Sequence, residues 1–280
     1  MKFSHPLGTQ PPMKSDAPSR GTTTTRVSRV PYLNSAPFFK GLALGEGFAL
    51  SDCVPRELGR RAAAGELTAG LLPATDYFRL SDAFERLGRF GIAVRGRAHS
   101  VFLFSRRPIR QLEGAAIAVT DETSTTGVLL RLLLEQRYHL QPAEYVRVAE
   151  APPAGAEPEA LLLIGDAALK FKHTNRAYPF EIDVAFEWWL WQHLPFVFAV
   201  WAVRKDAGAA EKRRLELSLA KSLGVNARQL ETIAAERAAD LGVPAAELAA
   251  YLAGFIYRLG PQEEEGLAKF QELVHVHHLL

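Results

Sequence analysis

Apolar residues in this chain come in strand-length runs, and the clearest runs end in a turn that leads into a helical pattern. Ala116–Val119 is followed by the polar run Thr120–Gly127 and then by a leucine-rich helical pattern over Val128–Tyr138. Ala160–Ile164 is likewise followed by Gly165–Asp166 and a further helical pattern. Alternating strands and helices are typical of a mostly parallel α/β sheet. Since no run approaches the roughly 18 apolar residues of a membrane-spanning helix, we expect no membrane partner.

The 280 residues form two strand-rich halves and a helical remainder that begins near Ala209. We interpret this order as a bilobed α/β fold with two lobes and a helical C-terminal tail. Val101–Ser105 and Phe196–Val203 are predicted to be the crossovers between the lobes, with the functional site in the cleft. The predicted parts are a disordered lead-in at 1–26, lobe one at 27–105 plus 204–280, and lobe two at 106–203, including the return crossover strand.

Charge and cysteine content narrow the class of partner. The formal net charge is only +2 and the charges are spread along the chain, so no nucleic-acid or anionic-membrane partner is expected. A single cysteine, Cys53, excludes an intrachain disulfide and a cysteine-cluster metal site. His275, His277 and His278 lie at the C-terminus, where fraying is expected instead of metal binding. Because Met1–Arg26 has no apolar secretory segment, we expect a cytoplasmic protein; its oligomeric state stays open.

The polar run Thr123–Gly127 lies between a predicted strand and a predicted helix. Hydroxyl groups and free backbone N–H groups at a helix N-terminus bind anions, and the helix dipole favours negative charge there. The run has neither the glycine spacing nor the lysine of a P-loop. We expect Thr123, Ser124, Thr125 and Thr126 to bind a carboxylate or phosphate. The alternative is plain N-capping by Ser124 or Thr123.

Three more polar residues lie beside predicted strands. Asn34 is in a turn between Tyr32 and Pro37, where its amide can hold a leaving group; the alternative is an Asx turn. Ser100 precedes a crossover strand and can donate to a ligand carboxylate, or else bond to its own backbone. Asp166 follows a buried strand, and open α/β sheets bind ligands at the carboxyl ends of strands; the alternative is a helix N-cap.

Ordered motifs in the chain resemble a known family. They are Arg29–Pro37, Ser100–Ser105, Thr123–Gly127, Leu162–Leu169, Leu194–Trp201, and Tyr257–Gly260 with Gly266–Leu267. Together they resemble the menaquinone-biosynthesis chorismate dehydratases of the futalosine pathway, over about Val27–Phe270. The chain departs from the family's acidic stretch before the tryptophan, at Phe186.

The resemblance implies a type II periplasmic-binding-protein fold used as a cytoplasmic enzyme. It implies a lyase that removes water from chorismate to give 3-[(1-carboxyvinyl)oxy]benzoate, with no metal and no organic cofactor. Asn34 matches the asparagine of the family's Tyr-Leu-Asn turn, and Ser100 and Thr123–Thr126 match its substrate-carboxylate contacts. The predicted catalytic residues are therefore Asn34 and Asp166, and the predicted substrate-binding residues are Ser35, Ser100, Thr123, Ser124, Thr125 and Thr126.

Two other functions stay open. A sister family of similar fold makes 1,4-dihydroxy-6-naphthoate and uses a histidine near the position of Gly165–Asp166, where this chain has none. A solute-binding protein has the same fold but needs a signal peptide, which Met1–Arg26 does not resemble. Incubation with chorismate separates the three, because only the dehydratase turns it over.

Overall fold

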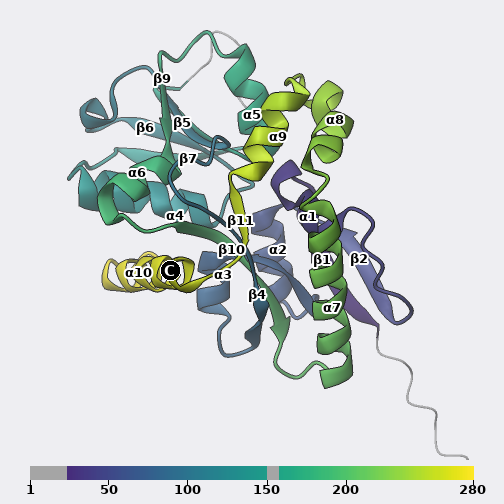
Figure 1. Cartoon of the computed structure of the whole chain (residues 1–280). Coiled ribbons are helices and arrows are strands. Elements are labelled where there is room, and N and C mark those ends of the chain that lie inside the picture. The colour runs from purple at the N-terminus through teal and green to yellow at the C-terminus, as the bar shows by residue number, and fades with distance from the viewer. Residues whose placement is uncertain (1–23, 150–157) are drawn as a thin grey trace, which may run out of the picture.

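A computed structural model describes residues 24–149 and 158–280 and shows two β-sheets (Figure 1). The first sheet has six strands. In their order across the sheet, these are β11 (Phe255–Arg258), β4 (Phe84–Val94), β10 (Phe196–Arg204), β3 (Ala69–Pro73), β1 (Thr25–Arg29) and β2 (Phe48–Asp52). Strand β1 pairs in parallel with β2 and β3, whereas β10 is antiparallel to β3 and β4.

The second sheet has five strands and occupies the upper part of Figure 1. In their order across the sheet, these are β7 (Glu144–Val148), β6 (Ala116–Thr120), β8 (Ala160–Ile164), β5 (Val101–Ser105) and β9 (Phe180–Asp183). Strand β6 is parallel to β7 and β8, whereas β5 is antiparallel to β8 and β9. In the first sheet, β10 and the edge strand β11 run opposite to the other strands, and in the second sheet β5 does. Both β10 and β5 lie between strands that run the other way.

Strands β5 and β10 each pair with the sheet of the other half of the chain. Val101–Ser105 pairs within the five-stranded sheet, although the sequence places it in lobe one. Phe196–Arg204 pairs within the six-stranded sheet, although the sequence places all of it but Arg204 in lobe two. Each strand belongs to the sheet that it enters after the crossover, because its backbone N–H and C=O groups find their partners there. The crossovers are therefore the connections before β5 and before β10, and the division into two lobes stays a prediction.

Helices cover both sheets and fill the C-terminal part. The helices of four or more residues are α1 (Ala36–Phe39), α2 (Pro55–Ala63), α3 (Ala74–Arg79), α4 (Thr125–Leu132), α5 (Gly165–Thr174), α6 (Val184–Gln192), α7 (Ala209–Asn226), α8 (Leu230–Leu241), α9 (Ala245–Ala253) and α10 (Pro261–Val276). A 3-10 turn spans Leu33–Ser35 and another Ile109–Gln111, and a π-helical turn over Leu133–Arg137 extends α4. The predicted α/β class with a helical C-terminal tail is confirmed.

Large aromatic side chains join the two sheets behind the cleft. Trp188 of α6 and Phe196 of β10 both pack edge-on against Phe270 of α10, with ring centroids 5.9 and 5.0 Å apart. All three side chains are almost fully buried. Burying such rings typically contributes about 1.5–3 kcal/mol each, so α10 holds the halves together.

The start of the described chain already belongs to the first sheet. The predicted lead-in lies outside the described residues except at its end, where Thr25 and Arg26 already pair with β2. Among the described residues, no helix is long and apolar enough to cross a bilayer.

Candidate active site

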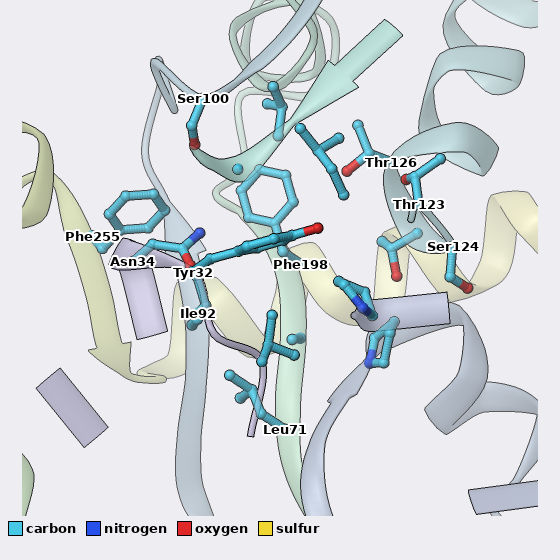
Figure 2. A pocket seen from close by; sticks show the side chains of 18 residues that line it. Tyr32, Asn34, Leu71, Ile92, Ser100, Thr123, Ser124, Thr126, Phe198 and Phe255 are labelled. Atoms are coloured by element: carbon cyan, nitrogen blue, oxygen red, sulfur yellow. The ribbon is translucent and has the colours of Figure 1, made fainter. Parts of the chain in front are cut away.

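A cavity of about 70 Å³ lies where strands of both sheets end (Figure 2). Tyr32 and Asn34 follow β1, Thr123–Thr126 follow β6, and Gly165 follows β8. Parallel strands bring their carboxyl ends to one edge of a sheet, and this is where open α/β sheets place ligands. The topology therefore brings together segments that are far apart in the sequence.

Tyr32 lies across the middle of this cavity, with its hydroxyl end toward Thr123–Thr126 (Figure 2). That hydroxyl donates a hydrogen bond to the carboxylate of Glu122, on the other side of the cleft. Burial, with help from this hydrogen bond, raises the pKa of Tyr32, so the phenol keeps its proton. Gly165 has φ +58°, and a Cβ there would lie 2.7 Å from Tyr32 Cδ2. Only glycine therefore fits at position 165 without displacing the Tyr32 ring.

Asn34 and Ser100 both line the cavity, as the sequence predicts. The Asn34 amide interacts with the Tyr251 hydroxyl and lowers its pKa, and among the described residues Asn34 makes no side-chain hydrogen bond within its own turn, so the Asx-turn alternative is not found. The Ser100 Oγ accepts a hydrogen bond from the same Tyr251 hydroxyl at 3.0 Å. The Ser100 carbonyl accepts the Gly165 N–H at 2.8 Å, which fixes the backbone. Tyr251 comes from α9, and no motif in the sequence singles it out.

Asp166 lies beside the cavity and is not among the residues that line it. Its Oδ1 accepts the Leu33 N–H at 2.9 Å, and its Oδ2 accepts Arg237 Nη2 of α8 at 2.7 Å. Burial raises the pKa of Asp166, and these two donors oppose that effect. With both oxygens occupied, the carboxylate holds the residue before Asn34 in place. The N-cap alternative is not found either, and the predicted catalytic role of Asp166 stays a prediction.

Ser35 is also outside the lining residues. Its buried hydroxyl donates to the Val30 carbonyl at 2.5 Å and to the Tyr32 carbonyl at 2.9 Å. These bonds close the turn that carries Asn34. The predicted substrate-binding role of Ser35 stays a prediction, and the geometry shows a hydroxyl already engaged within its own turn.

The four residues Thr123–Thr126 all line the opposite end of the cavity. Thr123 Oγ1 accepts the Gly127 N–H at 3.2 Å and so caps the helix, whereas Ser124 makes no capping bond. The Ser124 hydroxyl instead pairs with the hydroxyl of Thr75, which the sequence analysis missed, at 2.9 Å. Helix α4 begins at Thr125, three residues before the predicted start, because Thr123 completes its first turn.

Backbone N–H groups add to this end of the site. Among the described residues, the N–H groups of Thr125 and Thr126 have no hydrogen-bond acceptor. They belong to the first turn of α4, whose N–H groups lack partners within the helix. Together with the neighbouring hydroxyls, they can bind one carboxylate without a cationic side chain.

The cavity is otherwise apolar and uncharged. Among the described residues that line it, Tyr32 is the only one that can ionise. Its apolar walls include Leu71, Ile92, Phe198 and Phe255 (Figure 2). Within residues 24–149 and 158–280, no group of three or more His, Cys, Asp or Glu residues is placed to hold a metal ion. The expected absence of a metal stays a prediction.

Comparison of the whole sequence with known families gives one clear result. A family model described as menaquinone biosynthesis matches residues 25–275. The chorismate dehydratase of Thermus thermophilus is 34% identical over 255 residues, which cover 86% of this chain and 92% of that protein.

Solved structures show which fold this is. A protein from Archaeoglobus fulgidus superposes with a TM-score of 0.77 at 18% identity, over 94% of this chain and 100% of its own. The alkanesulfonate-binding protein of Xanthomonas axonopodis, bound to MOPS, has a TM-score of 0.67 at 14% identity, with 92% and 94% covered. A Candida albicans protein with the generic periplasmic binding protein fold has a TM-score of 0.65 at 9% identity, with 90% of each chain covered. The predicted periplasmic-binding-protein-like fold is therefore confirmed.

Proposed function

The chain belongs to the menaquinone biosynthesis family, and we propose that it is a chorismate dehydratase, a lyase that acts on a carbon–oxygen bond. The observation that carries the proposal is the arrangement of the cavity. A carboxylate-binding helix N-terminus lies at one end, and an amide and a hydroxyl lie at the other, with no charged side chain between them. The proposal includes a cytoplasmic location and a small-molecule substrate. It also includes the division of the chain into two lobes with the cleft between them.

One carboxylate of chorismate would bind at Thr123–Thr126. The free N–H groups of Thr125 and Thr126 and the hydroxyl of Ser124 supply the hydrogen bonds. The second carboxylate would lie near Ser100, whose hydroxyl faces the cavity from the other end (Figure 2). The ring of the substrate would then contact the apolar walls at Phe198 and Ile92.

Asn34 would assist the departure of the C4 oxygen. The reaction breaks the C3–H and C4–O bonds, forms the last double bond of an aromatic ring, and releases the C4 oxygen as water. Negative charge builds on the departing oxygen, and a positioned amide N–H stabilises it without needing a shifted pKa. Because aromatisation makes the reaction strongly favourable, the protein needs mainly to orient the substrate and exclude water.

The proton acceptor would be a carboxylate of the substrate itself. No Asp, Glu, His or Lys is among the described residues that line the cavity. Tyr32 stays protonated because its pKa is raised, so it cannot act as a base near neutral pH. A substrate carboxylate held close to C3 can take the proton and pass it to the leaving oxygen, so that atoms and charge balance.

Incubation of the purified protein with chorismate tests the proposal. Formation of 3-[(1-carboxyvinyl)oxy]benzoate, followed by NMR or absorbance, is expected, and it should persist in EDTA. Binding of chorismate without turnover would instead support a solute-binding protein. Conversion of cyclic dehypoxanthinylfutalosine to 1,4-dihydroxy-6-naphthoate would support the sister activity. The Asn34→Ala protein is the matched control, since it keeps the fold and lacks the proposed donor.

A further inference from the structure

Tyr251 connects the two polar groups at one end of the cavity, although it is not among the residues that line it. It lies on α9, in the helical C-terminal part, 151 residues from Ser100 in the sequence. Its side chain is buried, and its hydroxyl donates to Ser100 Oγ at 3.0 Å. The amide of Asn34 also acts on this hydroxyl, because it lowers the pKa of Tyr251.

The direction of these hydrogen bonds follows from the number of protons. A phenol has one proton, and here Tyr251 gives it to Ser100. Asn34 lowers the pKa of Tyr251, which is the effect of an amide N–H directed at the phenol oxygen. Ser100 accepts from Tyr251 and so keeps its own proton to donate into the cavity. Asn34 keeps its second N–H for the same purpose.

Burial keeps the proton of Tyr251 in place. Burial raises the pKa of Tyr251 well above its ordinary value, so the phenol stays protonated wherever the protein is folded and active. The protonated phenol thus keeps a proton to donate to Ser100, as the 3.0 Å hydrogen bond shows, and an amide N–H of Asn34 on its oxygen favours that direction. Both neighbours are therefore held as donors toward the substrate.

We propose that Tyr251 is a positioning residue that fixes the Asn34 amide and the Ser100 hydroxyl in the donor orientation that dehydration requires. This inference rests on the proposed function. It gives the helical C-terminal part a role in the chemistry, because α9 supplies the group that aligns residues from the two other segments. The preorganised donors then need no reorientation as the C4–O bond breaks.

The chain contains a matched control for this proposal. Tyr257 of β11 is also buried, but among the described residues its hydroxyl has no hydrogen-bond partner. Tyr251→Phe and Tyr257→Phe each remove one oxygen atom from a buried tyrosine near the same wall. Only the first change breaks a link to Ser100 and Asn34.

Steady-state kinetics with chorismate and thermal unfolding of both variants test the inference. Tyr251→Phe should lower kcat about 10- to 100-fold, because a misplaced Asn34 donor mainly raises the barrier, and should raise KM only a few-fold through Ser100. Tyr257→Phe should keep the wild-type kcat. The two variants should unfold within a few degrees of each other. A wild-type kcat in Tyr251→Phe, or an equal loss in Tyr257→Phe, would overturn the inference.

A double variant separates positioning from a structural effect. In an Asn34→Ala protein, Tyr251→Phe should reduce kcat by a much smaller factor than in the wild type, since the donor that acts on the barrier is already gone. If the kcat losses of the two single variants multiply fully in the double variant, the proposal is contradicted.

A crystal structure of Tyr251→Phe gives a readout that does not depend on activity. The Ser100 side chain should change rotamer in this variant and keep it in Tyr257→Phe. An unmoved Ser100 and Asn34 would overturn the inference even if the wild type failed to turn over chorismate. That last failure would count against the proposed function alone.

Discussion

The two ends of the cavity hold their polar groups in different ways (Figure 2). At one end, the amide of Asn34 and the hydroxyl of Ser100 depend on a single buried hydroxyl, that of Tyr251. At the other end, Thr123–Thr126 offer several hydroxyls and two N–H groups that have no acceptor among the described residues. The first end has few donors with a fixed direction, and the second has many interchangeable ones.

This difference matches what each end is proposed to do. A carboxylate carries its charge in the bound substrate and in the transition state alike, so several equivalent donors serve it equally well throughout. Charge on the departing C4 oxygen exists only as the bond breaks, so a donor there must already be aligned. Substitutions of Asn34 should therefore change kcat, and those of the carboxylate-binding residues, Ser100 and Thr123–Thr126, should change KM.

The largest effect is expected for Asn34→Ala. Loss of one preorganised donor to a developing oxyanion typically costs about 10²–10³ in kcat. Asn34→Asp should be as poor, because a carboxylate repels the developing charge. Both proteins should fold and still bind chorismate, as calorimetry would show. If Asn34→Ala keeps the wild-type kcat, the proposed difference between the two ends of the cavity is wrong.

Asp166 provides the next largest effect and separates two roles. As a positioning group it needs only an acceptor for the Leu33 N–H, which Asp166→Asn retains and Asp166→Ala does not. We expect Asp166→Ala to lose about 1–3 kcal/mol of unfolding free energy, because it leaves a buried N–H unsatisfied. Its kcat should fall about tenfold as Asn34 shifts.

Asp166→Asn is the control for that experiment. It should stay within a few-fold of the wild type in kcat, although it loses the charge of the pair with Arg237. Equal and severe losses of kcat in both variants would instead place Asp166 in the chemistry, as the sequence predicts.

The sequence predicts the residues that belong to local motifs and misses those that only the fold brings near. Asn34, Ser100 and Thr123–Thr126 each lie beside a strand end, and all line the cavity. Tyr251 lies in an alanine-rich helix with no motif around it, and its partners come from distant segments. The sequence gives only a weak indication that Thr75 belongs to the site, namely its position after Pro73 at the end of a strand.

Sheet membership of the crossover strands is a second limit of the sequence. Val101–Ser105 is buried at every position, and an apolar strand of this kind fits the centre of either sheet. The same holds for most of Phe196–Arg204. Periodicity identifies such a strand, but its neighbours depend on pairing with residues far along the chain. In the short strands β7 and β9 every residue except Asp183 is exposed or half-buried, and these strands carry too little apolar pattern to be predicted.

A smaller effect is expected at the Thr123–Thr126 end of the cavity. Ser124→Ala or Thr125→Val removes one hydroxyl and leaves the N–H groups of the first turn of α4 in place. Since these contacts exist in ground and transition states alike, KM should rise a few-fold, about 1 kcal/mol of binding, with kcat unchanged. A double Ser124→Ala, Thr125→Val protein should add the two effects. A loss confined to kcat would reverse the assignment of the two ends.

The smallest expected effect is the response of kcat to pH. The only side chain that can ionise among the described lining residues is Tyr32, and burial raises its pKa away from neutrality. A substrate carboxylate that acts as the base is ionised at any pH well above about 4, the ordinary value for such groups. Because the acceptor must be deprotonated, kcat should fall only as the pH drops toward that value. Between pH 6 and 8.5 kcat should change by less than about twofold.

Stopped-flow or NMR rates at saturating chorismate measure this pH response directly. A steep fall of kcat between pH 8.5 and 6 would show that a protein side chain takes the proton, and the assignment of the base to the substrate would be wrong.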